Sequence, residues 1–205
     1  MAALFPLFLK LKKRKCLMVG AGKIGEGKIA GLLAAGAHVY VVAPAATKRV
    51  RKWAREGKLR WLPREFRDSD LKECLLVVAA TSSSKLHKRI SRLARRRGVL
   101  CNVVDVPELC DFYYPAVVRR GALQIAVSTS GESPALAQRL RKKLEKEFGP
   151  EYEAWLRQLG KSRRKLTGIS RDLSERNTEL HAMASEESFQ AFLRESSVVS
   201  GKKKR

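Results

Sequence analysis

The feature that most constrains the fold of this chain is a glycine pattern, Gly20-Ala21-Gly22-Lys23-Ile24-Gly25. It directly follows the apolar run 16–19 and opens a segment with helical character, 26–35. In a phosphate-binding turn of this kind, Gly20 permits the turn, Gly22 lets the backbone approach the phosphates, and Gly25 lets helix and strand pack closely. The sequence therefore predicts a dinucleotide-binding unit with the anion on free N–H groups at the helix N-terminus.

Strand-like and helix-like segments alternate through the first half of the chain. The expected strands are 15–20, 38–43, 59–62, 75–81 and 99–104, and the expected helices are 25–35, 47–56 and 85–97. The run 75–81 is continuously apolar, as expected for a strand that is covered on both faces. This succession predicts an α/β fold, a Rossmann-like doubly wound parallel sheet with right-handed crossovers.

The pattern changes after about residue 111. Strands are expected at 115–119 and 123–128, followed by a loop of small residues, 128–134, and a helix, 135–148. Gly149-Pro150 is a break, and 152–159 and 175–192 have helical character. We divide the chain into a Rossmann dinucleotide-binding domain (1–111), a small α+β region (112–149), a helical C-terminal region (150–195) and a basic, disordered tail (196–205).

The balance of charge is strongly basic, with 43 Lys and Arg against 20 Asp and Glu and a net charge of +23. Such a balance indicates nucleic acid, anionic lipid or a polyanionic small molecule as a partner. The basic residues are spread along the chain without a nucleic-acid motif, so a solvated basic surface explains most of them. No apolar run approaches the length of a membrane span and no cleavable signal pattern is present, so we expect a cytoplasmic protein.

The cysteines and histidines form no ligand set. The cysteines are Cys16, Cys74, Cys101 and Cys110, without a CxxC pair or a histidine at zinc-finger spacing. They are expected to be reduced, buried thiols rather than a metal site or disulfides. The three histidines, His38, His87 and His181, are not paired into a catalytic set and are expected to be structural or exposed.

A lone carboxylate, Asp105, follows the predicted strand 99–104. In an open parallel sheet, ligands bind outside the C-terminal ends of the strands, which is where a nicotinamide ring would lie. A carboxylate there takes or guides a proton, or anchors a cationic substrate nitrogen. A structural turn or cap explains Asp105 equally well from spacing alone.

The acidic residue common in NAD sites is missing here. Such sites often carry Asp or Glu about 20 residues beyond the glycines, where it holds the ribose hydroxyls. This chain has Ala43-Pro44-Ala45-Ala46-Thr47 in that region, followed by Lys48 and Arg49. The sequence thus leaves NADP open beside NAD, with the backbone groups of Pro44 and Ala45 as a lining for the adenosine pocket.

Several blocks resemble the precorrin-2 dehydrogenases of the sirohaem synthase family, in order and from about residue 4 to residue 148. They are Leu7-Phe8-Leu9, the run 16–22, Val42-Ala43-Pro44, Ala79-Ala80-Thr81, Asn102-Val103-Val104-Asp105, the run 115–121 and the run 125–137. The Asn-Val-Val-Asp block and the Ser-Thr-Ser-Gly-Glu-Ser-Pro-Ala block are far more specific than the glycines. The family includes the N-terminal half of bifunctional bacterial sirohaem synthase.

The resemblance implies oxidation of precorrin-2 to sirohydrochlorin with NAD⁺ and, in some members, insertion of Fe²⁺ to give sirohaem. It implies a homodimer whose interface involves residues 112–148. It places the essential aspartate on Asp105 and the serine that is phosphorylated in some members on Thr129. With the glycine pattern, it gives a cofactor site of Gly20, Gly22, Lys23, Ile24, Gly25, Pro44, Ala45 and Thr81.

Three readings of the function remain open at this point. The first is a dehydrogenase acting on a tetrapyrrole, whose carboxylates a basic cleft would hold. The second adds iron chelation in the same cleft, without a dedicated metal-ligand set. The third is a nucleotide-sensing or nucleic-acid-binding Rossmann protein with salt-dependent binding. With 205 residues, the chain leaves no room for a methyltransferase module, so we expect a separate uroporphyrinogen methyltransferase upstream.

Overall fold

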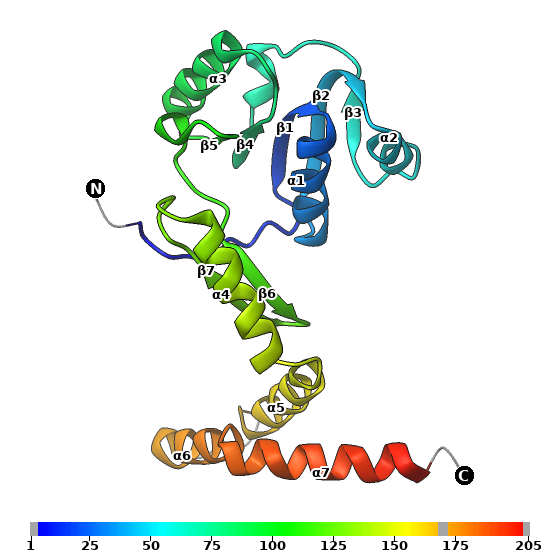
Figure 1. Ribbon diagram of the computed structural model, residues 1–205, viewed down its shortest axis with the longest axis vertical. Coiled ribbons are helices and arrows are strands. Elements are labelled where there is room, and N and C mark those ends of the chain that lie inside the picture. The colour runs from blue at the N-terminus through cyan, green and yellow to red at the C-terminus, as the bar shows by residue number, and fades with distance from the viewer. Residues whose placement is uncertain (1–3, 168–171, 203–205) are drawn as a thin grey trace. The chain divides into compact units, whose positions relative to one another are not determined.

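The computed structural model describes residues 4–167 and 172–202. The chain divides into two compact units, residues 1–114 and 115–205, and each is described here by itself (Figure 1). Within the described residues, no helix combines the length and the apolar character that crossing a membrane requires.

The first unit is a five-stranded parallel sheet in the order β3-β2-β1-β4-β5. Its strands are β1 (Lys15–Ala21), β2 (His38–Ala46), β3 (Arg60–Leu62), β4 (Leu76–Ala79) and β5 (Leu100–Val103). Its helices are α1 (Lys23–Ala34), α2 (Lys48–Arg55) and α3 (Ser84–Arg96), with short 3₁₀ turns η1 (Asp68–Leu71) and η2 (Pro107–Leu109).

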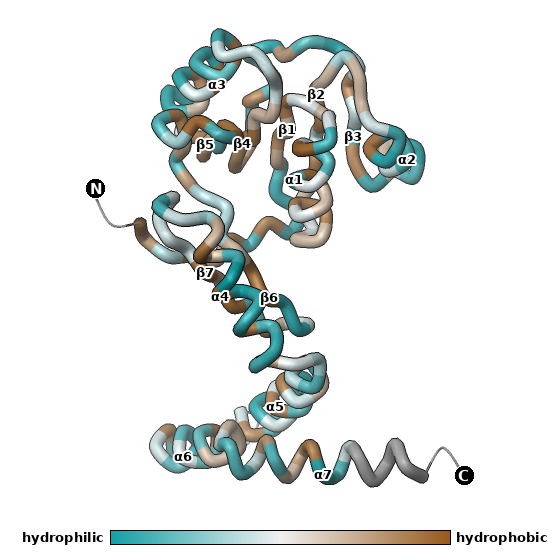
Figure 2. The backbone as a smooth tube through the Cα atoms, in the orientation of Figure 1, coloured by the Kyte–Doolittle hydropathy of each residue, from teal (hydrophilic) through white to brown (hydrophobic). Residues whose placement is uncertain are grey.

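The two faces of the sheet are both buried. Cys16 and Met18 of β1 pack on one face with Ile29 of α1. The residues between them point the other way, so that Leu17 packs with Ile90 of α3. This period of two on a sheet covered on both sides explains the continuous apolar strands, which appear brown in Figure 2. The predicted doubly wound parallel sheet is confirmed.

The strand order reverses beside β1, which pairs with β2 on one side and β4 on the other. Ligands of open α/β sheets bind at such a switch point, outside the carboxyl ends of the strands. The predicted end of β2 at residue 43 is wrong, because the strand continues to Ala46. The register shifts at Pro44, where residues 43–45 of β2 lie opposite Gly20 alone, and Ala21 then pairs with Ala46.

The second unit begins with an antiparallel hairpin, β6 (Ala116–Arg120) and β7 (Leu123–Val127), followed by α4 (Pro134–Glu147). Arg120 fastens the end of α4 to the hairpin, since its guanidinium donates to the carbonyls of Phe148 (2.8 Å) and Glu145 (2.9 Å). The Ser133 hydroxyl caps α4 by accepting from the Leu136 N–H, at 3.2 Å. The hairpin and the helix predicted here are confirmed.

Three further helices follow, α5 (Glu151–Thr167), α6 (Leu173–Met183) and α7 (Glu186–Lys202). The single helix predicted over 175–192 is wrong, because α6 ends at Met183 and a separate helix, α7, begins at Glu186. The Ser185 hydroxyl caps α7 by accepting from the Ser188 N–H, at 3.2 Å, and acidic residues follow in the first turn. The predicted tail, 196–205, overlaps α7 as far as Lys202, and 203–205 lie outside the described residues.

Candidate dinucleotide-binding site

Two glycines of the fingerprint are required by the fold itself. Gly20 has φ +98°, and a Cβ there would lie 2.1 Å from the carbonyl oxygen of Ala80. A Cβ on Gly25 would lie 2.7 Å from the Gly20 carbonyl oxygen and 3.1 Å from Cε of Met18. The contacts with the two carbonyl oxygens are closer than real Cβ atoms approach, so any side chain would push the turn away from β4 or the helix away from β1.

Gly22 differs, because no atom lies within 4 Å of the Cβ position there. It is the N-cap of α1, and it is exposed together with Lys23 and Ile24. The first N–H groups of a helix have no partners within the helix, and its N-terminus favours anions. An open backbone at a helix N-terminus is a geometry that fits a pyrophosphate.

Thr81, at the end of β4, is held by a histidine that sequence reasoning treated only as structural or exposed. His87 of α3 is 7% exposed, and its Nε2 lies 3.0 Å from Oγ1 of Thr81. The Ser83 N–H also donates to Oγ1 of Thr81, at 3.4 Å. His87 therefore positions Thr81. The sequence signal for this contact was the place of His87 in the first turn of the helix that follows the strand.

At the end of β2, Pro44 and Ala45 are exposed and no acidic side chain follows. The carboxylate of this region comes from α1 instead. Glu26 accepts a hydrogen bond of 2.6 Å from the Thr47 hydroxyl and pairs with Arg49 at 3.3 Å. These contacts tie the start of α1 to the start of α2 beside the exposed strand end.

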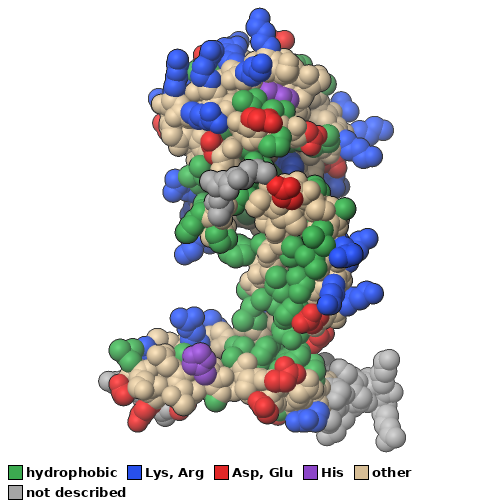
Figure 3. Space-filling view, turned by 60° about the vertical axis from the view of Figure 1, so that its left-hand side comes forward, with side chains coloured by type: hydrophobic (Ala, Val, Ile, Leu, Met, Phe, Trp, Pro, Cys, Tyr) green, Lys and Arg blue, Asp and Glu red, His purple; other side chains and the backbone are tan. Residues whose placement is uncertain are grey.

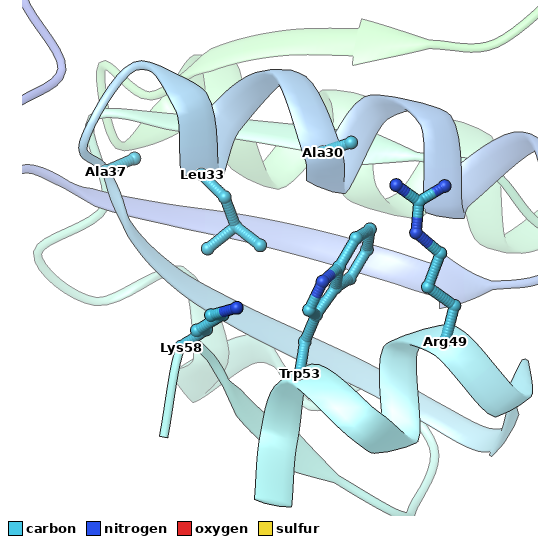
Figure 4. Close-up of a pocket in the computed structure, with 6 residues that line it drawn as sticks. All are labelled: Ala30, Leu33, Ala37, Arg49, Trp53 and Lys58. Carbon is cyan, nitrogen blue, oxygen red and sulfur yellow. The ribbon is translucent and has the colours of Figure 1, made fainter. Parts of the chain in front are cut away.

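A pocket between α1 and α2 lies in the same unit and is shown in Figure 4. Ala30, Leu33, Ala37, Arg49, Trp53 and Lys58 line it. The Arg49 guanidinium lies 4.7 Å from the centre of the Trp53 ring and is also paired with Glu26. Leu33 and Trp53 pack against the core on the first face of the sheet. We therefore interpret this pocket as a gap between two packed helices and not as a ligand site.

Asp105 lies in the turn after β5, with φ +61° and an exposed side chain. The turn is closed by the Val106 N–H, which donates to the Val103 carbonyl at 3.2 Å. The Cys110 thiol makes two contacts with the backbone of Val103. It accepts from the Val103 N–H at 3.2 Å and donates to the Val103 carbonyl at 3.1 Å. The carboxylate is thus presented by a loop that is tied back to the sheet.

The chain after η2 is fixed beside β5 by partly buried polar contacts. Asn102 is 7% exposed, and its side-chain amide donates to the Phe112 carbonyl at 2.8 Å. The Cys101 N–H donates to the Asp111 carboxylate at 2.9 Å. The Asn102 to Asp105 block singled out in the sequence therefore combines a buried anchor with an exposed acid.

Thr129 belongs to the second unit, in the loop before α4. Its hydroxyl accepts from the Ser133 N–H at 3.1 Å, and its carbonyl accepts from the Glu132 N–H at 2.9 Å. Ser130 follows with φ +53° and Gly131 with φ +91°. The loop of small residues is thus a closed turn that leads directly into the Ser133 cap.

The cysteines are free thiols. Cys16, Cys74 and Cys101 are buried, and Cys110 is half-buried. Burial raises the pKa of Cys16 to about 11 and that of Cys101 to about 12. In the part of the chain that the structure describes, no three His, Cys, Asp or Glu side chains gather in a way that would hold a metal ion.

Comparison with known families agrees with this geometry. A family model for NAD(P)-binding domains matches residues 7–116, which contain the sheet, the glycine turn and Asp105. The chain belongs to this NAD(P)-binding family. A second model, described as sirohaem biosynthesis protein central, matches residues 120–147 of the second unit.

Curated relatives of this NAD(P)-binding protein include a siroheme synthase of Nitrosococcus oceani, 38% identical over 80% of this chain. Another is a siroheme synthase of Methylobacillus flagellatus, 42% identical over 68% of this chain. The matches cover 36% and 30% of those proteins, so the chain spans about a third of their length. The resemblance to the sirohaem synthase family is confirmed.

Among solved structures, the chain is similar to SirC, a precorrin-2 dehydrogenase, with 26% identity and a TM-score of 0.76. That match covers 94% of this chain and 98% of the other, so it includes the helical region beyond residue 150.

Proposed function

We propose that this chain oxidises precorrin-2 to sirohydrochlorin with NAD⁺. The observation that carries the proposal is the similarity to SirC over nearly its whole length, together with an open glycine turn at the switch point of the sheet. In balance, precorrin-2 and NAD⁺ give sirohydrochlorin, NADH and a proton. NAD⁺, when bound, supplies the hydride acceptor.

Different residues of the first unit bind the cofactor, accept the proton and attract the substrate. The N–H groups at the start of α1, beside Gly22, bind the pyrophosphate, and Thr81 is held in place at the end of β4. Asp105, exposed and fixed by its turn, accepts the proton that the macrocycle loses. On the face shown in Figure 3, Lys and Arg side chains are spread over the first unit, and their charge attracts a substrate that carries carboxylates.

NAD⁺ rather than NADP⁺ is the cofactor that we propose, with Pro44 and Ala45 lining the adenosine pocket. Arg49, one of two cations that follow this strand end, pairs with Glu26 at 3.3 Å and lies over the Trp53 ring, so a 2′-phosphate would compete with these contacts. A preference for NAD⁺ in binding measurements would support this reading. Tighter binding of NADP⁺ would overturn it.

Insertion of Fe²⁺ into sirohydrochlorin is a second activity to test, because two relatives at 38–42% identity are siroheme synthases. Iron would be the substrate, and Asp105 would take the pyrrole N–H protons that the metal replaces. We place the upstream methylation of uroporphyrinogen in a separate methyltransferase. Free cysteines fit a reducing compartment, which supports a cytoplasmic location.

A homodimer, with residues 112–149 as the dimerisation region, is also proposed. β7 alternates between half-buried and exposed residues, and none of them is fully buried in this unit. Leu136 and Leu140, one turn apart on α4, are each 37% exposed. Light scattering should show a monomer for Leu140→Glu and a dimer for the control Gln138→Glu. If both variants are dimers, or if the wild type is a monomer, this surface is refuted.

We also propose that Thr129, which lies in the same region, is phosphorylated, and mass spectrometry of the purified protein tests this.

The function is tested anaerobically. The purified chain is mixed with precorrin-2 and NAD⁺, and in parallel with NADP⁺, while NADH or NADPH and the sirohydrochlorin spectrum are followed. Fe²⁺ or Co²⁺ is added afterwards, beside a control without enzyme for spontaneous insertion. Cofactor-dependent turnover would establish the dehydrogenase, and no turnover with either cofactor would overturn it.

A further inference from the structure

Lys28 of α1 is a half-buried lysine that belongs neither to the proposed cofactor site nor to the proposed catalytic step. Its ammonium nitrogen lies 3.7 Å from the centre of the Tyr114 ring. Contact with a ring face stabilises a cation by electrostatic attraction but uses none of its N–H groups in conventional hydrogen bonds. The side chain is therefore held in one place while its donors stay available.

Among the residues that the structure describes, none is an anionic partner of the ammonium at close range. Within residues 4–167 and 172–202, no carboxylate lies within 4.0 Å of Nζ of Lys28 and no oxygen accepts a hydrogen bond from it. Burial lowers the pKa of Lys28, while the charges of Asp105 and Cys110 act in the opposite direction. A partly desolvated charge without a partner costs stability, which a ligand of opposite charge would recover.

The surroundings of Lys28 belong to the candidate site. Tyr114 packs on Phe112, with 5.6 Å between the ring centres. The carbonyl of Phe112 accepts from Asn102, three residues before Asp105. Lys28 is thus held against the segment that is anchored to β5, and the Asp105 charge reaches it.

We propose that Lys28 binds a carboxylate of the tetrapyrrole substrate beside Asp105. The inference rests on the proposed function, because it takes the anion to be a peripheral carboxylate of the macrocycle. An ammonium held on a ring and a carboxylate form a charge-assisted hydrogen bond that fixes the orientation of the substrate. The ammonium would thereby hold the ring atoms that lose hydrogen next to Asp105.

The test compares Lys28→Met and Lys28→Arg with a matched control, Lys88→Met, which removes an exposed lysine of α3. Binding is measured with uroporphyrin, an octacarboxylate porphyrin, by quenching of tryptophan fluorescence, and NAD⁺ binding and Tm are measured in parallel. Lys28→Met should weaken uroporphyrin binding and raise the KM for precorrin-2 by about tenfold, since one charged hydrogen bond is lost. Lys28→Arg should retain most of the affinity, and Lys88→Met all of it.

Equal uroporphyrin affinity of wild type and Lys28→Met would overturn the inference. An equal loss of NAD⁺ affinity would also overturn it, because Lys28 would then serve the cofactor. Binding of uroporphyrin that depends on Lys28, without any oxidation of precorrin-2, would refute the proposed reaction and leave the carboxylate site standing. Failure of the Lys28 inference and failure of the proposed reaction therefore give different results.

Discussion

The hydroxyl oxygen of Thr81 lies 3.0 Å from the Nε2 nitrogen of His87, and the histidine is buried. The contact joins the end of β4 to the first turns of α3. It restricts the rotamer of a threonine that the family resemblance places against the cofactor. We propose that this buried histidine positions a cofactor-binding residue.

Replacing His87 should weaken cofactor binding more than it changes the fold. In His87→Leu the imidazole is lost and Thr81 is free to rotate, so we expect the Kd for NAD⁺ to rise several-fold, the size of one net hydrogen bond. Isothermal titration checks this, with His38→Leu, an exposed histidine, as the control. Thr81→Val combined with His87→Leu should cost little more than either change alone. Full additivity of the two changes would refute the coupling.

The glycines of the turn should separate stability from binding. Gly20→Ala forces a Cβ into the carbonyl of Ala80 at a positive φ, so we expect a loss of at least about 2 kcal/mol in the free energy of unfolding. Gly22→Ala meets no protein atom, so it should keep the wild-type Tm and lose NAD⁺ binding. Denaturant titration and cofactor binding of both variants check this. A stable Gly20→Ala, or a Gly22→Ala that binds normally, would contradict the geometry.

The buried thiols should make stability depend on alkaline pH. The pKa values of Cys16 and Cys101 are raised from 9.0 to about 11 and about 12 by burial. Well below pH 9 these thiols are protonated in both states, and their contribution to stability is fully present. As the pH rises above 9, the unfolded thiols ionise first, so the free energy of unfolding should fall.

Chemical denaturation at about pH 8 and about pH 10 measures this dependence, with Cys16→Ala/Cys101→Ala as the comparison. The double variant should lose less stability over the same interval, because it lacks the two groups. The wild-type thiols should also react with a thiol reagent only after unfolding. An equal pH dependence of the two proteins would contradict the assignment to these cysteines.

Much of the first unit was predictable, because its strands are buried on both faces and its turn needs particular glycines. The run Cys16 to Val19 followed by Gly20 fixes a strand and a turn through local constraints. The roles of His87 and Lys28 were not predictable, since they depend on which side of a helix faces the strand ends. The break at Ser185 was missed because the apolar pattern continues across it, although Ser185 with acids behind it is a helix start.

The central claim is that the Asp105 carboxylate takes part in the oxidation of precorrin-2. It is tested most directly by anaerobic turnover of precorrin-2 with NAD⁺, using wild type and Asp105→Ala side by side. The account predicts NADH and sirohydrochlorin from the wild type. It predicts a variant that folds with a slightly lower Tm, because Ala tolerates the φ of +61° less well than Asp, and that keeps the NAD⁺ affinity but lacks turnover. Turnover by Asp105→Ala at the wild-type rate would remove Asp105 from the mechanism, and no turnover by the wild type would contradict the proposed function itself.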